Sequence, residues 1–112
     1  MDEWTQIGER YREMVNNERY GAFAREMLDL VEQIQVDSRF ADVLPSMALN
    51  TLTLKVPQSM RRVHVFWENS GEYSIYLDHC EDQFYGENTR AKKEEAVTTI
   101  LTYLQRLRSG EW

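Results

Sequence analysis

Apolar side chains recur at helical spacing through the first third of the chain. Two runs, at residues 4–15 and 20–34, have apolar side chains three or four positions apart, which is typical of a helix with one buried face. The pattern changes phase at Asn16 and Asn17. The sequence therefore predicts two helices, or one helix that is kinked at the two asparagines.

Capping residues predict where two further helical segments begin. Asp37 or Ser38 can cap a short helical turn that continues through Leu44 and ends at Pro45, because the residue before a proline disfavours the helical conformation. Asn88 or Thr89 is expected to cap the last helix, whose apolar positions again recur at helical spacing.

Between these helical segments the pattern changes to a period of two. Residues 51–56, 62–67 and 73–78 alternate apolar with polar side chains, as strands with one buried face do. The ENSGE segment at residues 68–72 has the asparagine and glycine of a hairpin loop. Residues 83–85 (QFY) form a candidate fourth strand. The sequence predicts an antiparallel meander of three to four strands with one apolar face.

The predicted fold class is α+β, with N-terminal helices (two, or one kinked), a three- to four-stranded antiparallel meander and a C-terminal helix packed on one sheet face. A length of 112 residues with 42% hydrophobic side chains fits one domain over residues 1–112. Cys80 is the only cysteine, so no disulfide can form within the chain and a cytoplasmic location is expected. The charged N-terminus is unlike a secretory signal, and no apolar run is long enough to span a bilayer.

The hairpin loops also predict the register of the strands. If the second hairpin centres on Ser70, His64 pairs with Tyr76, and the first hairpin then places Thr53 beside His64. The outer face of the sheet would present His64, Phe66 and Tyr76 among threonines. Two alternatives follow: the N-terminal region folds across this face as a second core layer, or the face is open and its rings serve as anchors for a partner.

Charge is unevenly distributed along the chain. The net charge is −6, from 13 basic and 19 acidic residues. Residues 43–67 contain three bases and no acid, and residues 68–88 contain six acids and no base. Nucleic-acid binders need a basic surface to displace counterions, so direct nucleic-acid binding is disfavoured. Carboxylates interleaved with aromatic side chains suit a basic protein partner instead.

One acidic stretch, IYLDHCEDQFYGE at residues 75–87, contains several side chains that could bind a metal or transfer a proton. On a strand, however, neighbours such as His79 and Cys80 point in opposite directions. Zinc requires about four ligands, and this chain has two histidines and one cysteine. The sequence also lacks the common nucleophile, phosphate-loop and dinucleotide motifs. We therefore expect no enzymatic activity and no cofactor; the alternative is a metal-dependent enzyme or module that uses His64, Asp78, His79 and Cys80.

The order of helix, three antiparallel strands and final helix is similar to that of double-stranded RNA-binding domains. The segment GENTRAKKEEAV (residues 86–97) resembles the basic start of their last helix at Lys92 and Lys93. The resemblance implies an RNA-binding surface at this point. Glu94 and Glu95 follow at once and the first helices are acidic, so the residues themselves argue against RNA binding.

These observations favour a small binding protein of the immunity, antitoxin or anti-defence type. It would block a basic partner, such as a nuclease or another nucleic-acid enzyme, by steric and electrostatic occlusion. The candidate contact residues are acidic or aromatic: Glu72, Glu81, Asp82, Phe84, Tyr85 and Glu87, with His64, Phe66 and Tyr76 on the sheet. A further alternative is a homodimeric structural subunit in which the aromatic sheet face forms the interface.

Overall fold

The computed structural model of the protein describes residues 2–48, 51–57, 59–68, 70–77 and 87–110. These residues form an α+β fold, as predicted, but with five strands instead of three or four. In chain order the elements are α1 (Glu3–Met14), α2 (Gly21–Gln35), the short 3-10 helix η1 (Ser38–Phe40), β1 (Leu44–Ala48), β2 (Thr51–Lys55), β3 (Arg62–Trp67), β4 (Tyr73–Leu77), β5 (Glu87–Ala91), the 3-10 helix η3 (Lys93–Glu95) and α3 (Ala96–Ser109).

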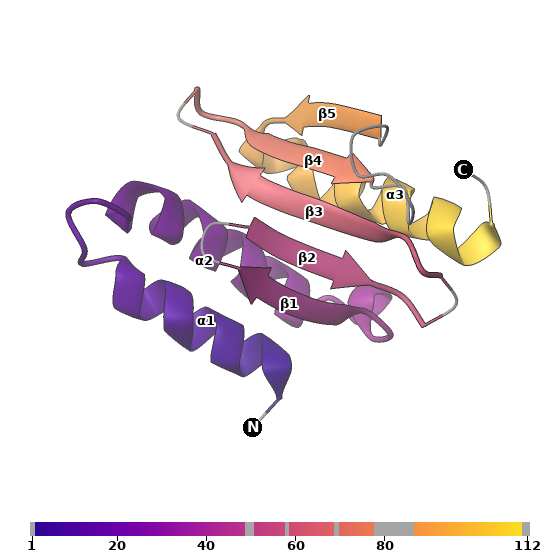
Figure 1. Cartoon of the computed structure of the whole chain (residues 1–112), viewed down its shortest axis with the longest axis horizontal. Helices are drawn as coiled ribbons and strands as arrows, with labels where there is room; N and C mark the ends of the chain where they lie inside the picture. The colour runs from indigo at the N-terminus through magenta and orange to yellow at the C-terminus, as the bar shows by residue number, and fades with distance from the viewer. Residues whose placement is uncertain (1, 49–50, 58, 69, 78–86, 111–112) are drawn as a thin grey trace.

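The strands form one antiparallel sheet in the order β1-β2-β3-β4-β5, so each strand lies beside its neighbour in the chain (Figure 1). On the central strand, His64 pairs with Thr53 of β2 and with Tyr76 of β4. This register is the one that the hairpin loops predict. The register between β3 and β4 continues to Trp67, which pairs with Tyr73.

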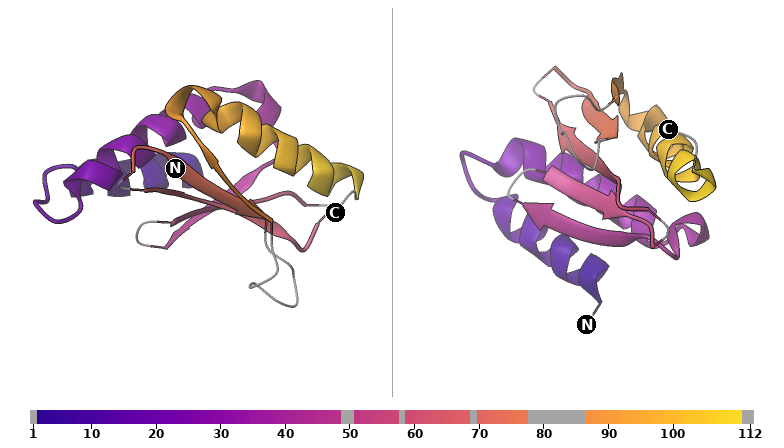
Figure 2. Two further views of the ribbon diagram at one scale, coloured as in Figure 1. Left: turned by 90° about the horizontal axis from the view of Figure 1, so that it is seen from above. Right: turned by 45° about the vertical axis from the view of Figure 1, so that its right-hand side comes forward.

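All three α-helices lie on the same face of the sheet (Figure 2). α1 packs against α2 and β1, α2 lies against β3, and α3 lies against β3 and β4. The N-terminal region therefore does not fold across the outer face, and no described element covers that face. Among the described helices, none combines the length and apolar character needed to cross a membrane.

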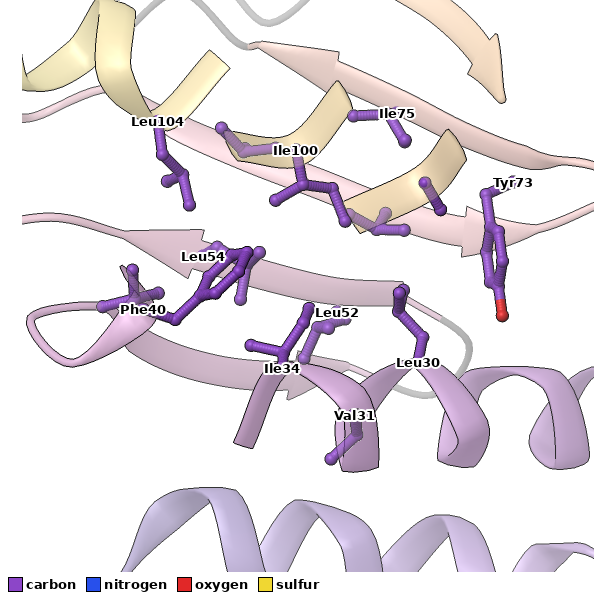
Figure 3. Close-up of a cluster of buried hydrophobic side chains, with 14 of the residues drawn as sticks. Leu30, Val31, Ile34, Phe40, Leu52, Leu54, Tyr73, Ile75, Ile100 and Leu104 are labelled. Atoms are coloured by element: carbon purple, nitrogen blue, oxygen red, sulfur yellow. The ribbon is translucent and has the colours of Figure 1, made fainter. Parts of the chain in front are cut away.

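The core lies between the sheet and the helices. Figure 3 shows Leu30 and Ile34 of α2 and Ile100 of α3 gathered with Leu52 and Ile75 of the sheet, and all five side chains are at most 1% exposed. Each aliphatic side chain buried in this way stabilises the fold by roughly 1.5–3 kcal/mol relative to its exposed state. The inward positions of β2, β3 and β4 are similarly buried: Leu52, Leu54, Val63, Val65, Tyr73, Ile75 and Leu77.

Two separate helices form at the N-terminus, which decides between the two alternatives. Asp2 caps α1 by accepting a hydrogen bond from the amide of Thr5 at 2.7 Å. The side chain of Asn17 accepts hydrogen bonds from the amides of Arg19 at 2.8 Å and Tyr20 at 3.1 Å. These bonds stabilise a turn between α1 and α2, because asparagine side chains readily bond to nearby backbone amides.

The expected helical turn from Asp37 through Leu44 is too long. Asp37 does cap η1, accepting a hydrogen bond from the amide of Arg39 at 3.0 Å, but the helical segment is three residues long. The chain then enters β1, in which Leu44 pairs with Lys55 and Pro45 lies within the strand. A proline is tolerated there because β1 is an edge strand.

The expected start of the last helix is also wrong. Asn88 and Thr89 lie within β5, where Thr89 pairs with Ile75, and α3 begins at Ala96. The residues that favour a helix cap, asparagine and threonine, here occupy a short polar edge strand that pairs with β4. The candidate fourth strand at residues 83–85 lies outside the described residues.

Candidate functional site

The face of the sheet opposite the helices is the candidate site. Because side chains alternate along a strand, every second residue of each strand points to this face. We call this surface the outer sheet face. Its described members are Leu44, Ser46 and Ala48 on β1, Thr51, Thr53 and Lys55 on β2, Arg62, His64 and Phe66 on β3, Ser74 and Tyr76 on β4, and Asn88 and Arg90 on β5.

One row of residues crosses the whole sheet at the centre of this face. Ser46, Thr53, His64, Tyr76 and Asn88 are successive cross-strand partners from β1 to β5. The row contains two rings, three hydroxyl groups (one of them on the Tyr76 ring) and one amide. It thus combines apolar contact area with hydrogen-bonding groups, as the centre of many protein interfaces does.

The rings of the outer sheet face hold one another in place. His64 and Tyr76 are stacked, with ring centroids 4.7 Å apart and planes inclined by 20°. Phe66 meets Tyr76 edge-on, with centroids 6.4 Å apart. Thr53 Oγ1 lies 3.0 Å from Nδ1 of His64 and hydrogen-bonds to it. The cluster is therefore ordered before any partner binds, which lowers the entropy cost of docking.

Charged residues lie at both ends of the outer sheet face. At one end, two cations lie side by side, because Lys55 of β2 and Arg62 of β3 are cross-strand neighbours. At the other end, Nε of Arg90 lies 2.9 Å from Oε2 of Glu68, the residue that follows β3. The described part of the outer sheet face is therefore uncharged at its centre and charged at both ends.

Among the acidic residues predicted to contact a partner, Glu72 is the one whose side chain the structure describes. With Lys92 and Lys93 it lines a cleft of about 430 Å³ beside the β3–β4 turn. Lys93 is held by other contacts as well, because its Nζ lies 2.7 Å from Oε2 of Glu26 and 5.4 Å from the centre of the Trp67 ring. The cleft therefore contains both signs of charge.

The remaining candidate contact residues belong to the acidic stretch at residues 75–87. Glu81, Asp82, Phe84 and Tyr85 lie outside the described residues. Glu87 begins β5, but its side chain is not among those that the structure describes. Their proposed contacts with a partner stay predictions.

The two residues on either side of segment 78–86 lie in the sheet. Leu77, the last residue of β4, pairs with Val63 of β3 and with Glu87 of β5. The end of β4 and the start of β5 therefore lie at the end of the sheet that carries Lys55 and Arg62.

The metal alternative rests mainly on residues outside the described part of the chain. No group of three or more histidine, cysteine, aspartate or glutamate residues there is arranged to hold a metal ion. Three of its four proposed ligands, Asp78, His79 and Cys80, lie outside the described residues. The fourth, His64, hydrogen-bonds through Nδ1 to the hydroxyl group of Thr53.

The titratable groups with shifted pKa values belong to the packing of the fold. Burial raises the pKa of the phenols of Tyr11 and Tyr73. Hydrogen bonds from Arg108 lower the pKa of the Asp42 carboxyl group. Tyr11 and Tyr73 lie in the core and Asp42 links to α3, so these shifts report on stability.

Sequence reasoning found the central rings but missed the two edge strands. Ser46, Asn88 and Arg90 belong to the outer sheet face only because β1 and β5 exist. β1 was not predicted because it contains Pro45, and β5 was not predicted because its sequence, ENTRA, is polar. The weak sequence signal of β5 is the alternation of the less polar Thr89 and Ala91, which are partly buried and buried, with the exposed Asn88 and Arg90.

Comparison with known protein families, curated proteins and solved structures finds no match to this chain.

Proposed function

We propose that the protein is a small binding protein of the inhibitor type that docks on a partner protein through its outer sheet face and carries out no chemistry itself. The observation that supports this proposal is the ordered cluster of His64, Phe66 and Tyr76 on a face that no described helix covers. Aromatic side chains at the centre of a surface are the residues that most often dominate binding energy.

The mechanism is steric blockade. A five-stranded sheet backed by three helices is a rigid platform, so little conformational freedom is lost when it docks. The rings would fill apolar depressions on the partner, and the Thr53 hydroxyl and the Asn88 amide would bond to its polar groups. Occupation of the partner's own binding groove then prevents its normal ligand from entering.

The partner that we propose is basic, for example a nuclease or another nucleic-acid enzyme. The net charge of −6 supports this choice, because opposite net charges accelerate encounter. Glu72, Glu81, Asp82 and Glu87 are the proposed acidic contacts, with Phe84 and Tyr85 beside them. Long-range steering of this kind weakens as salt rises.

Affinity capture with paired variants tests the docking role. The tagged chain is used to capture partners from extracts of its native host, and captured proteins are compared between wild type, Phe66→Thr and Phe23→Thr. Phe23 is the matched control: it is half-buried on α2, on the helical side, and its ring meets Tyr20 edge-on at 5.7 Å.

The proposal predicts that Phe66→Thr lowers the affinity for the captured partner at least about tenfold, the loss expected of a central aromatic anchor. Phe23→Thr should leave it unchanged. Equal capture by wild type and Phe66→Thr would show that the outer sheet face is not the docking surface.

A separate measurement tests the charge of the partner. Association rates of the captured partner are measured at increasing salt for wild type and for the double variant Glu81→Lys, Asp82→Lys. A basic partner requires slower association with added salt and with charge reversal. Rates that respond to neither change would exclude a basic partner while leaving the docking face intact.

A further inference from the structure

The outward side of β3 carries a self-complementary series of side chains. Reading along the strand and one residue beyond it, the outward residues are Arg62, His64, Phe66 and Glu68: a cation, two rings and an anion. The ion pair between Glu68 and Arg90, which shares a row with Phe66, places the Glu68 carboxylate on the same face. Read backwards, the series is an anion, two rings and a cation.

We infer that the outer sheet face docks a second copy of this chain, face to face, about a two-fold axis that lies between the two sheets and crosses β3 at right angles over Val65. Arg62 and Glu68 each lie three residues from Val65, so such an axis places Arg62 of one copy against Glu68 of the other, and the reverse. The same operation places His64 against Phe66. A two-fold interface requires this kind of match between a surface and itself.

The direction of this axis favours a full overlap of the two sheets. Because the axis runs at right angles to the strands, each of the five strands lies over its own copy, and the full width of one sheet covers the other. The residues that flank its rings are small or of moderate size, namely Thr51, Thr53 and Ser74. They allow two sheets to approach to the distance of about 10 Å at which sheets pack.

Glu68 has the capacity to accept a second cation. Its carboxylate is already within 2.9 Å of Nε of Arg90, and its side chain is 22% exposed. An ionised carboxylate has about four acceptor positions, so it can bind Arg62 of the other copy while it keeps Arg90. The partly buried position makes the added contact less sensitive to solvent than a fully exposed ion pair.

The area of the sheet predicts a weak dimer. Strands about 4.8 Å apart that rise about 3.3 Å per residue give five strands of about five residues a face of roughly 400 Å². A standard interface buries about 800 Å² on each partner. We therefore expect a dimer that forms at high micromolar concentration and that a more tightly bound partner displaces. The inference rests on the proposed docking role of the outer sheet face. It adds that a second copy of the chain binds there, which the proposed function does not require.

Sedimentation equilibrium of the full chain tests the inference through charge reversal. Wild type should be a reversible dimer. Arg62→Glu and Glu68→Arg should each raise the dissociation constant at least about tenfold, because each replaces two attractions per dimer with two repulsions. Arg25→Glu, an equal reversal at an exposed position on α2, should leave the dissociation constant unchanged.

Mixing the two charge-reversal variants, Arg62→Glu and Glu68→Arg, tests directly whether positions 62 and 68 face each other in the dimer. In a mixed dimer, glutamate at position 62 of one chain faces arginine at position 68 of the other, and the second contact retains Arg62 and Glu68. An equimolar mixture should therefore dimerise within about threefold of wild type, while each variant alone stays largely monomeric. Circular dichroism and melting temperature verify that each variant is folded.

Three outcomes would overturn the inference: a wild type that is monomeric up to millimolar concentration, single reversals that dimerise like wild type, or a mixture that associates no better than its components. None of these affects the capture test with Phe66→Thr, which decides the proposed function separately.

Discussion

Arg108, in the last turn of α3, holds the carboxylate of Asp42 with two hydrogen bonds, from Nε at 3.1 Å and from Nη2 at 2.6 Å. The two residues are 66 positions apart in the sequence. Nη2 of Arg108 also donates to the carbonyl oxygen of Arg39 at 3.1 Å. One guanidinium group therefore ties the end of the last helix to η1 and to the segment between η1 and β1.

This link predicts a pH-dependent contribution to stability. Asp42→Asn should lower the free energy of unfolding by about 0.5–1 kcal/mol at neutral pH, a modest value because solvent screens a carboxylate whose side chain is 39% exposed. Since Arg108 lowers the pKa of Asp42 below its usual 3.8, the contribution is complete above that value and is lost as the pH falls through the lowered pKa. Urea unfolding at neutral pH and at an acidic pH below the lowered pKa should show the difference from wild type disappear.

The control for this prediction is Asp29→Asn. Asp29 is an exposed carboxylate on α2 that accepts a single hydrogen bond from Gln33 at 3.1 Å. Its substitution should change the unfolding free energy by less than about 0.5 kcal/mol at either pH. A loss at Asp42 that persists unchanged in acid would contradict the ion-pair explanation.

Two glycines on the first helices predict opposite responses to the same substitution. A Cβ atom on Gly21 would lie 2.5 Å from the backbone oxygen of Val15, which cannot move without opening the turn between α1 and α2. Gly21→Ala should therefore destabilise the protein by about 1–3 kcal/mol. A Cβ on Gly8 would make ordinary contacts, at 3.9 Å, with Leu28 and Val31. Gly8→Ala should stabilise α1 by about 0.5–1 kcal/mol. Thermal unfolding of both variants measures the two effects, and loss of stability at Gly8 would show that α1 and α2 pack more tightly than described.

The central strands were predictable because two physical signals agree there. Alternation of apolar and polar residues identifies the buried face of β2, β3 and β4, and the short hairpin loop at Ser70 fixes how Val65 and His64 align with β4. A shift by one residue would move Val65 out of the core, so the register is strongly specified. The rings on the outer sheet face follow directly from that register.

The edge strands were not predictable from the same signals. β1 contains Pro45, which normally argues against a strand, and β5 has the polar sequence of a loop. Both strands depend on pairing with a neighbour that local sequence does not reveal. The sequence also could not predict whether α1 and α2 cover the outer sheet face. Each helix has one apolar stripe, and that stripe could pack against either side of the sheet.

Two buried tyrosines provide a matched test of a core hydrogen bond. The Tyr73 hydroxyl donates to the backbone oxygen of Glu26 at 2.5 Å, joining β4 to α2. The Tyr11 hydroxyl is buried without a hydrogen-bond partner in the described part of the chain. Tyr73→Phe should therefore cost about 1–2 kcal/mol of unfolding free energy, since it leaves a carbonyl unpaired. Tyr11→Phe should be neutral or stabilising, because it removes a polar group that has already lost its contact with water. Chemical denaturation of both variants measures the difference, and equal losses would contradict the assigned hydrogen bond.

Neighbouring residues on β3 test the two faces of the sheet directly. Val65 is fully buried among the helices, whereas Phe66, the next residue, is half-buried on the outer sheet face. Val65→Thr should lower the unfolding free energy by about 1–3 kcal/mol, because it buries a hydroxyl group in an apolar core. Phe66→Thr should cost less than about 1 kcal/mol, because threonine suits a strand and the lost ring contacts lie at the surface. Denaturation of both variants under the same conditions gives the comparison.

The relative size of these two losses also bears on function. If Phe66→Thr were the more damaging substitution, Phe66 would belong to a second core layer and the outer sheet face could not receive a partner. If it remains folded and close to wild type in stability, any loss of partner capture in this variant reflects a missing contact and not an unfolded chain. The same measurement therefore decides whether the rings on β3 and β4 are available for binding.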